Sequence, residues 1–311
     1  MKFLGEIFRR MDKNIYELQN KDIIINALVV QSKLYSKAKR INYLSLILCV
    51  LLPISYSLTK NFLSGEILLT IGALFTIALV FISPALSTCA FKQKRTAAKI
   101  QQTIDYFLFE DDTFKTRDDE WGELYTKDEL LEFIAKTKFS KKDMENKKNW
   151  YSDYSSYPHV MQAYYSQCEC VRWDEDLRKC FVKGLYICGA FLITVVLILA
   201  VALKMTVFEL VINIATFAPL IKVLLPLKKK LVDDCNRLKK ISYEHSTINN
   251  QFGVVIGGEE LYAKIIKIQR QLYDHRANAI MVPDFFYRFL RDKQQKIEDK
   301  IASQKTNGGE L

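Results

Sequence analysis

The chain has 311 residues, of which 26% are charged, and its formal net charge is +10. The positive charge is spread along the chain and is not collected in one basic arm, which argues against a protein that follows a nucleic-acid duplex. The sequence contains no P-loop, no nucleophile elbow, no zincin motif and no dinucleotide-binding glycine fingerprint. We therefore expect a protein that is not an enzyme, and we assign no catalytic residue.

Four apolar runs are each long enough to cross a bilayer, since a membrane helix needs about 20 apolar residues. They come as two pairs with short connections, namely Ile41–Leu58 with Ile67–Ser87, and Gly184–Leu203 with Val207–Leu227. This pattern predicts an all-α membrane protein with four transmembrane helices in two hairpins. Long cytoplasmic helices extend these hairpins and form a helical cytoplasmic domain.

Basic residues flank the apolar runs on one side only. They lie before the first and third runs and after the second and fourth, whereas the two short connections carry little charge. By the positive-inside rule, both termini and the central segment are cytoplasmic. The predicted organisation is a cytoplasmic helix (1–40), transmembrane hairpin 1 (41–87), a central cytoplasmic segment (88–183), transmembrane hairpin 2 (184–227) and a C-terminal cytoplasmic segment (228–311).

Several helix boundaries can be predicted outside the apolar runs. A helix over about 14–40 is expected to continue into the first run without a break. Thr126 and Glu129 form a capping-box pattern that starts a helix. The Tyr/Ser-rich segment Tyr151–Pro158 predicts a break before the helix that feeds the third run. Three more helices are expected after residue 228, and Pro283 opens the last of them.

The fourth apolar run is the most polar. Glu209, Asn213 and Thr216 recur at helical spacing and share one face. Polar groups in a membrane helix usually face protein or water, so this stripe is either pore-lining or a helix-pairing surface. A simpler alternative is that Glu209 is interfacial and Asn213 bonds a neighbouring helix.

The densest group of aromatic and basic residues lies just before the third run. It contains Trp150, Tyr151, Arg172, Trp173 and Arg178. Aromatic faces stack on nucleobases and arginines bind phosphates, so this group is a candidate nucleotide-binding site. The alternative is an ordinary aromatic core of a cytoplasmic bundle with a surface ion pair, since Asp174 is four residues before Arg178.

Cysteine and histidine provide no metal site. The seven cysteines are scattered, and Cys168-x-Cys170 lacks the second cluster that a structural zinc site needs. We expect no metal and no cofactor.

Short motifs follow one another across nearly the whole chain. They are Gln31, Tyr35–Lys39, Gln101-Gln102, Asp105-Tyr106, Asn149–Tyr151, Cys168, Arg172–Asp174, Leu177-Arg178, Pro283-Asp284, Arg288 and Arg291. With these motifs and its two-hairpin plan, the chain resembles a family of bacterial anti-phage proteins. These are the four-transmembrane effectors associated with SMODS-type cyclic-oligonucleotide synthases, in the defence systems called CBASS.

The resemblance implies an effector of the bacterial inner membrane that a cyclic di- or trinucleotide activates. Its functional partner would be a cyclic-nucleotide synthase. Activation would permeabilise the lipid bilayer and cause abortive infection. Four helices are too few for a wide pore, so a homo-oligomer such as a tetramer is expected. The alternatives are a membrane scaffold or a constitutive small channel without a nucleotide ligand, and a membrane enzyme that acts on lipid.

Overall fold

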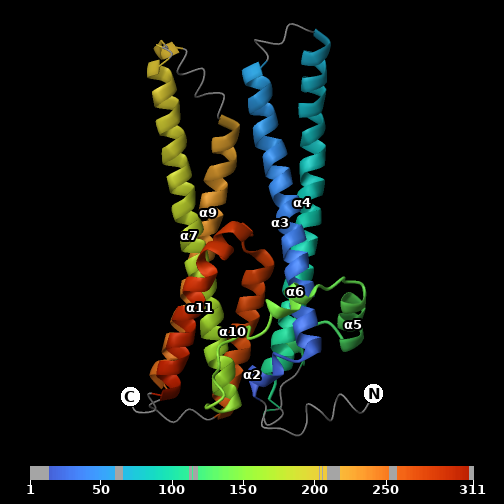
Figure 1. The fold of residues 1–311 in the computed structure, drawn as a ribbon, viewed down its shortest axis with the longest axis vertical. Coiled ribbons are helices and arrows are strands. Elements are labelled where there is room, and N and C mark those ends of the chain that lie inside the picture. The colour runs from blue at the N-terminus through green and yellow to red at the C-terminus, as the bar shows by residue number, and fades with distance from the viewer. Residues whose placement is uncertain are drawn as a thin grey trace.

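The computed structural model describes residues 14–59, 66–111, 114, 118–202, 204, 206–208, 218–251 and 258–307. In this part of the chain all regular structure is helical. Four long helices dominate and form two pairs. The first pair is α3 (Asp22–Thr59) with α4 (Glu66–Phe109), and the second is α7 (His159–Ala202) with α9 (Ala218–Gln251). The two pairs rise side by side from a shared base (Figure 1).

The base is completed by shorter helices. They are α2 (Ile15–Leu18), the 3₁₀ helix η1 (Asp118–Trp121), α5 (Lys127–Ala135), α6 (Lys141–Glu145), α10 (Gly258–Asn278) and α11 (Asp284–Asn307). Helices α10 and α11 lie beside the second pair, whereas α5 and α6 lie beside the first pair (Figure 1). Helix α10 also packs against α4, so it connects the two pairs.

The buried core lies in the base. Its largest cluster draws apolar side chains from α3, α4, α7, α9 and α10, including Leu28, Ile104 and Ile265. These residues recur at helical spacing, so each long helix presents an apolar stripe to its neighbours at this end. This cluster is the main core of the base, which also contains two smaller clusters, and residues of all three line the site described below.

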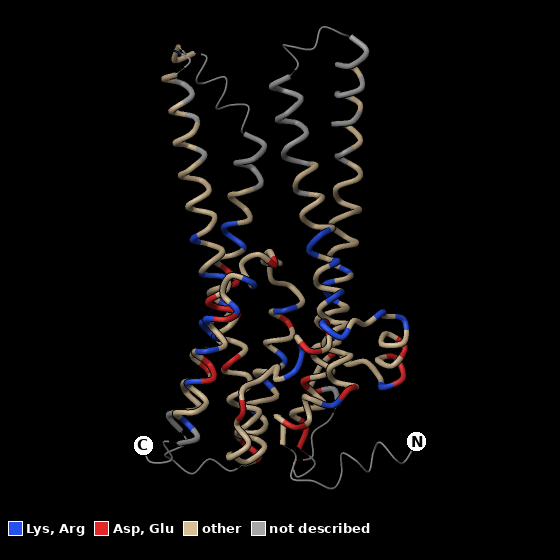
Figure 2. The backbone as a smooth tube through the Cα atoms, viewed as in Figure 1, with Lys and Arg blue, Asp and Glu red and all other residues tan. Residues whose placement is uncertain are grey.

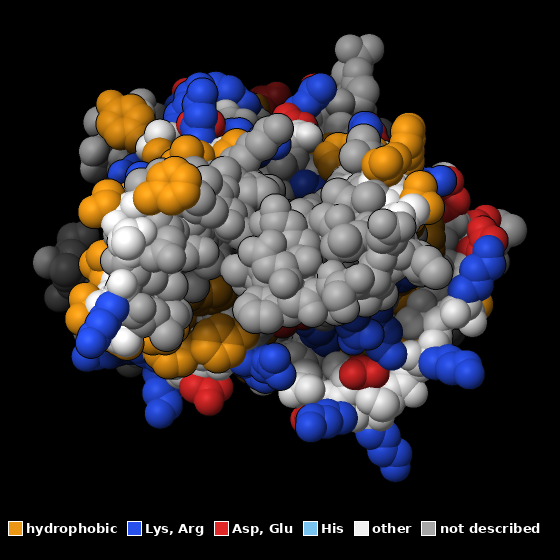
Figure 3. Space-filling view, turned by 90° about the horizontal axis from the view of Figure 1, so that it is seen from above, with side chains coloured by type: hydrophobic (Ala, Val, Ile, Leu, Met, Phe, Trp, Pro, Cys, Tyr) orange, Lys and Arg blue, Asp and Glu red, His pale blue; other side chains and the backbone are white. Residues whose placement is uncertain are grey.

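The upper parts of the long helices differ from the base in charge and exposure. Figure 2 shows that the charged residues lie mainly in the base and in the parts of the long helices next to it. The described residues of the long helices above this region carry almost no charge. Large apolar side chains there are exposed, among them Phe81, Ile187, Phe191 and Val201. Seen from above, such side chains lie on the flanks of the helix ends (Figure 3). Exposed apolar surface of this extent marks a face that contacts a partner or a membrane.

No helix within the described ranges is both long enough and apolar enough to meet the usual criterion for a membrane span.

Several predicted helix boundaries are confirmed. Thr126 caps α5, where its hydroxyl accepts from the Glu129 backbone N–H at 3.3 Å and the Glu129 carboxylate accepts from the Thr126 N–H at 2.7 Å. Helix α7 begins at His159, after the Tyr/Ser-rich break, and α11 begins directly after Pro283. The expectation of one helix from residue 14 onward is wrong, because the chain breaks between α2 and α3 at Gln19–Lys21.

Candidate ligand-binding site

A cavity of about 340 Å³ lies in the base, between the two helix pairs. Helices α3, α4, α7, α10 and α11 and the segment between α6 and α7 all contribute to its wall. Its volume is at the lower end of the usual range for small-molecule sites, roughly 300–1,000 Å³. Basic side chains outnumber acidic ones in the lining: Lys39, Lys94, Lys147, Lys148, Arg178, Arg276 and Arg291 face Glu169, Asp174 and Asp284.

Aromatic rings form much of the remaining wall. Trp173 of α7 and Tyr287 of α11 lie with ring centroids 5.8 Å apart and planes inclined by 32°. Trp150 and Tyr151 come from the segment before α7, and Tyr35 comes from α3. The cavity thus combines flat aromatic faces with positive charge, which is the chemistry that binds nucleotides.

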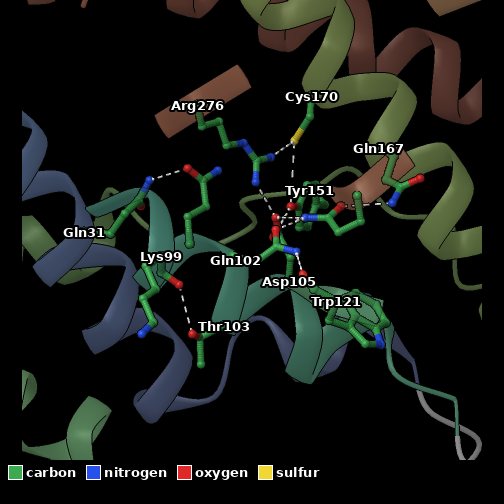
Figure 4. A network of polar contacts seen from close by, with 12 residues as sticks. Gln31, Lys99, Gln102, Thr103, Asp105, Trp121, Tyr151, Gln167, Cys170 and Arg276 are labelled. Atoms are coloured by element: carbon green, nitrogen blue, oxygen red, sulfur yellow. Dashed lines mark hydrogen bonds and ion pairs between the residues drawn. The ribbon is translucent and has the colours of Figure 1, made fainter. Parts of the chain in front are cut away.

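A buried polar network centred on Asp105 of α4 lies next to the cavity and shares Tyr151, Cys170 and Arg276 with its lining (Figure 4). The Asp105 carboxylate accepts from the Tyr151 hydroxyl at 2.7 Å, from Gln269 Nε2 at 2.8 Å and from Arg276 Nη1 at 2.6 Å. Arg276 also lies 3.4 Å from the Cys170 sulfur. Burial raises the pKa of the Cys170 thiol to about 12, which favours the protonated form of this cysteine.

Glutamine side chains on α3, α4, α7 and α10 extend the network. Gln269 of α10 donates to Gln102 of α4 at 3.0 Å and accepts from Gln167 of α7 at 2.9 Å. Gln31 of α3 donates to Gln101 of α4 at 2.9 Å. Buried amides joined in this way fix the positions of the helices that carry them. The network therefore connects both helix pairs.

Arg178 lines the cavity but is already engaged by protein groups. Its Nη1 donates to Asp234 Oδ2 at 2.8 Å and to the Ile280 carbonyl at 3.1 Å, and its Nε lies 3.1 Å from Asp174. Burial alone would raise the pKa of Asp174, but Arg178 and His275 outweigh it and hold that pKa well below its usual range. The predicted Asp174–Arg178 pair is confirmed, with Arg178 buried and the half-buried Asp174 also bonded to His275.

Four of the five predicted ligand-binding residues meet at this cavity, namely Trp150, Tyr151, Trp173 and Arg178. Arg172 lies outside the lining. Its guanidinium makes two hydrogen bonds to the buried Glu298 carboxylate of α11. Successive side chains of an α-helix point about 100° apart, so Arg172 cannot share the direction of its neighbour Trp173.

Two cationic side chains of the cavity, Lys147 and Arg291, were not singled out by the local residue pattern. Lys147 precedes Trp150 in a run of lysines that is typical of a solvated surface, and Arg291 lies 141 positions further along the chain than Trp150. The family resemblance did include Arg291, together with Gln31, Tyr35, Lys39 and Gln101, which also line the cavity. The resemblance is therefore the sequence signal that points to these five residues, whereas no sequence signal points to Lys147.

The segment between α10 and α11, residues 279–283, lines the cavity and contacts all four long helices. We call it the strap. On the side of the first pair, Lys94 of α4 donates to the Ala279 carbonyl at 2.9 Å, and Tyr43 of α3 donates to the Met281 carbonyl at 2.7 Å. Burial lowers the pKa of Lys94 to about 8, with nearby Asp234 partly opposing this effect.

The strap also bonds to the second pair. The Ile280 N–H donates to Asp234 of α9 at 2.7 Å, and the Ile280 carbonyl accepts from Arg178 of α7. At its end, where α11 begins, the Asp284 carboxylate lies 2.6 Å from the ammonium of Lys39 on α3. A change in the cavity that moves the strap would therefore reach both helix pairs at once.

The structure does not test the polar stripe predicted for the fourth apolar run. Glu209, Asn213 and Thr216 lie outside the described residues. Among the residues that are described, no group of histidine, cysteine and carboxylate side chains is arranged to hold a metal ion.

Comparison with protein families matches residues 13–304 to the family described as the SMODS-associating 4TM effector domain. The match covers nearly the whole chain, so the protein belongs to this family. It is thus an effector-domain protein associated with SMODS systems. No curated protein matches the chain, and neither does any solved structure.

Proposed function

We propose that this protein is an effector of the bacterial inner membrane that a cyclic di- or trinucleotide activates. Activation would permeabilise the membrane and lead to abortive infection. The observation that carries the proposal is the cavity between the two helix pairs, which is lined by aromatic and basic side chains. Membership of a SMODS-associated effector family supports the nature of the ligand, because these systems are linked to cyclic-nucleotide signalling.

The chemistry of the wall suits such a ligand. Trp150, Trp173 and Tyr287 offer faces on which nucleobases can stack, each contact being worth about 1–3 kcal/mol. The surrounding lysine and arginine side chains offset the charge of the phosphodiesters. The protein acts by binding and has no assigned catalytic group.

The position of the cavity suggests how binding reaches the membrane. Its wall includes both helix pairs and the strap, so a ligand that fits better when the pairs are rearranged would shift the population toward that arrangement. In this proposal the upper parts of the pairs span the bilayer as four helices, with both termini cytoplasmic. Several copies assemble into a homo-oligomer, such as a tetramer, to form the pore.

Dye release from liposomes tests the proposal. The full-length protein is reconstituted into dye-filled vesicles, and cyclic di-AMP, cyclic di-GMP, cyclic GMP-AMP and cyclic tri-AMP are added in turn. Release with one ligand and none without it is the expected result. Release without ligand would support a constitutive channel, and no release from folded protein would support a scaffold.

A substitution in the cavity wall tests whether the ligand binds in this cavity. Trp173→Ala removes a stacking face, so we expect ligand affinity measured by calorimetry to fall by about tenfold or more. Tyr243→Ala is the matched control, since Tyr243 is 72% exposed and lies outside the cavity lining. Equal affinity for the two variants would contradict the placement of the ligand.

A further inference from the structure

Two cations of the cavity, Lys147 and Arg291, differ from the others in their pairing. Among the residues that the structure describes, no carboxylate oxygen lies within 4.0 Å of the charged nitrogens of either side chain. Lys147 instead holds its ammonium 4.8 Å from the centroid of the Trp150 ring. Both side chains line the cavity.

The remaining basic side chains of the cavity are all engaged. Lys148 pairs with Glu145 at 2.7 Å, and Lys39 pairs with Asp284 at 2.6 Å. Lys94 donates to the Ala279 carbonyl of the strap. Arg178 donates to Asp234, and Arg276 donates to Asp105. A ligand anion can therefore bind Lys147 and Arg291 without breaking an existing ion pair.

The surroundings of Lys147 are positive. Burial, together with the like charges of Arg291 and Lys39, lowers the pKa of its ammonium to about 8. Asp143 of α6 and Asp284 of α11 oppose this effect only in part. An anion placed between Lys147 and Arg291 would relieve their repulsion.

The segment that carries Lys147 and Trp150 is held firmly. Asn149 has a φ of 51°, in the left-handed region that asparagine tolerates better than most residues. Its backbone N–H donates to the Asn20 side chain at 3.0 Å, and the Tyr151 N–H donates to Gln19 at 2.7 Å. Lys147 is thus presented by a preorganised segment, which lowers the entropy lost when a ligand binds.

A second cavity, of about 700 Å³, adjoins this place. It shares Lys148, Asn149, Tyr151, Arg291 and Gln295 with the first cavity. Arg291 therefore lies where the two cavities meet, so a ligand larger than the first cavity could extend past it.

We propose that Lys147 and Arg291 form the anion subsite of the cavity and hold a phosphodiester of the ligand beside the face of Trp150. This inference rests on the proposed function for the identity of the ligand. It concerns the shared chemistry of a phosphodiester and not one particular base.

Single substitutions test the subsite by calorimetry on the full-length protein in detergent, with the same four cyclic nucleotides. Lys147→Gln and Arg291→Gln are each expected to lower affinity by about tenfold to a hundredfold, as the loss of a charged hydrogen bond does. Lys136→Gln is the matched control, because this exposed lysine at the C-terminal end of α5 lies outside both cavities and already has Glu132 as its partner. Its affinity should stay within about threefold of wild type.

Unchanged affinity for Lys147→Gln and Arg291→Gln would overturn the subsite while leaving the proposed function intact. Without ligand, both variants should unfold at a temperature no lower than wild type, because a repulsion has been removed. A loss of affinity that comes with a lower unfolding temperature in both variants would assign the two cations a structural role and overturn the proposal.

Proton uptake gives an independent readout. A bound phosphodiester should return the pKa of Lys147 toward its ordinary value, so binding at a pH just above 8 takes up a proton. Calorimetry in two buffers of different ionisation enthalpy measures this uptake. Lys147→Gln should reduce this uptake and the control Lys136→Gln should not. Equal uptake in the two variants would contradict the assignment.

If no cyclic nucleotide binds the wild-type protein, the proposed function fails and the subsite is tested by itself. Inorganic pyrophosphate then replaces the nucleotide, with sodium chloride of equal ionic strength as the reference. A rise in unfolding temperature in wild type that the Lys147→Gln/Arg291→Gln double variant lacks would support an anion site. An equal response would overturn it.

Discussion

Glu169 is a buried carboxyl group in the wall of the cavity. It is 2% exposed and accepts from the Ser152 N–H at 3.0 Å. Burial raises its pKa to about 8, a shift that Ser152 opposes and the nearby Glu298 carboxylate favours. The unfolded chain gives up this proton near the ordinary pKa of about 4.3. The folded protein therefore loses stability as the pH rises from the unfolded pKa toward the folded one.

Glu169→Gln should remove this pH dependence, since the amide keeps the acceptor oxygen and carries no charge. Near the unfolded pKa the variant and wild type should have the same free energy of unfolding. As the pH rises to the folded pKa, the variant should become more stable than wild type by up to about 1.4 kcal/mol per pH unit. Thermal unfolding of the detergent-solubilised protein across this range measures the difference. Glu132→Gln, at an exposed position, is the control. Parallel stability curves for Glu169→Gln and wild type would contradict the expected titration.

The aromatic and basic side chains of residues 150–178 could be predicted from the sequence as a candidate site, because they lie close together along the chain. The opposite wall could not be predicted from any local pattern, because α3, α10 and α11 reach the cavity only through tertiary packing; only the family resemblance pointed to some of its residues. Arg172 illustrates the limit. Its type fits a phosphate ligand, but its partner Glu298 is 126 residues away and no local pattern indicates that pairing.

Among the helices, the contact of α7 with α11 depends on one small residue. A Cβ added to Gly184 would lie 2.7 Å from the Cζ atom of Phe286. The Phe286 ring is held between Phe181 and Phe285, with centroids 5.1 and 5.5 Å away. It therefore has little room to move, and the start of α11 would have to shift.

Gly184→Ala should lower stability by about 1–3 kcal/mol, as overpacking does, and weaken ligand binding because α11 carries Tyr287 and Arg291. Unfolding and calorimetry measure the two effects. Gly189→Ala on the same helix is the control, since nothing in the described part of the chain lies within 4 Å of its added Cβ. Adding Phe286→Leu to Gly184→Ala should restore part of the loss. Stability and ligand affinity equal to wild type in Gly184→Ala would contradict this prediction and show that α11 moves to make room for the added methyl group.

Helix boundaries could be predicted where local chemistry sets them. The capping box at Thr126 is such a case, because both of its hydrogen bonds join residues three apart. The break between α2 and α3 is the opposite case. Gln19 bonds to Tyr151 across 132 positions and Asn20 bonds to Asn149 across 129, and this tertiary contact decides the local conformation.

For the whole molecule, the central expectation is that a ligand changes the separation of the two helix pairs. The chain offers two natural probes, since Cys89 on α4 and Cys188 on α7 are exposed. With the other cysteines replaced by serine or alanine, spin labels at these two positions report the distance between the pairs. We expect the distance distribution to shift when an activating cyclic nucleotide is added. An unchanged distribution, with binding shown in the same sample, would contradict coupling through the separation of the pairs.

The strap has a consequence for the synthesis of the protein. Lys39 and Asp284, which anchor it, are 245 residues apart in the chain. A ribosome therefore completes both helix pairs before it makes the segment that joins them and the helix that carries Arg291. A nascent or prematurely terminated chain lacks one wall of the cavity and cannot respond to a ligand as the finished chain does. If the finished protein damages the membrane of its own cell, this order of synthesis would protect that cell from unfinished copies.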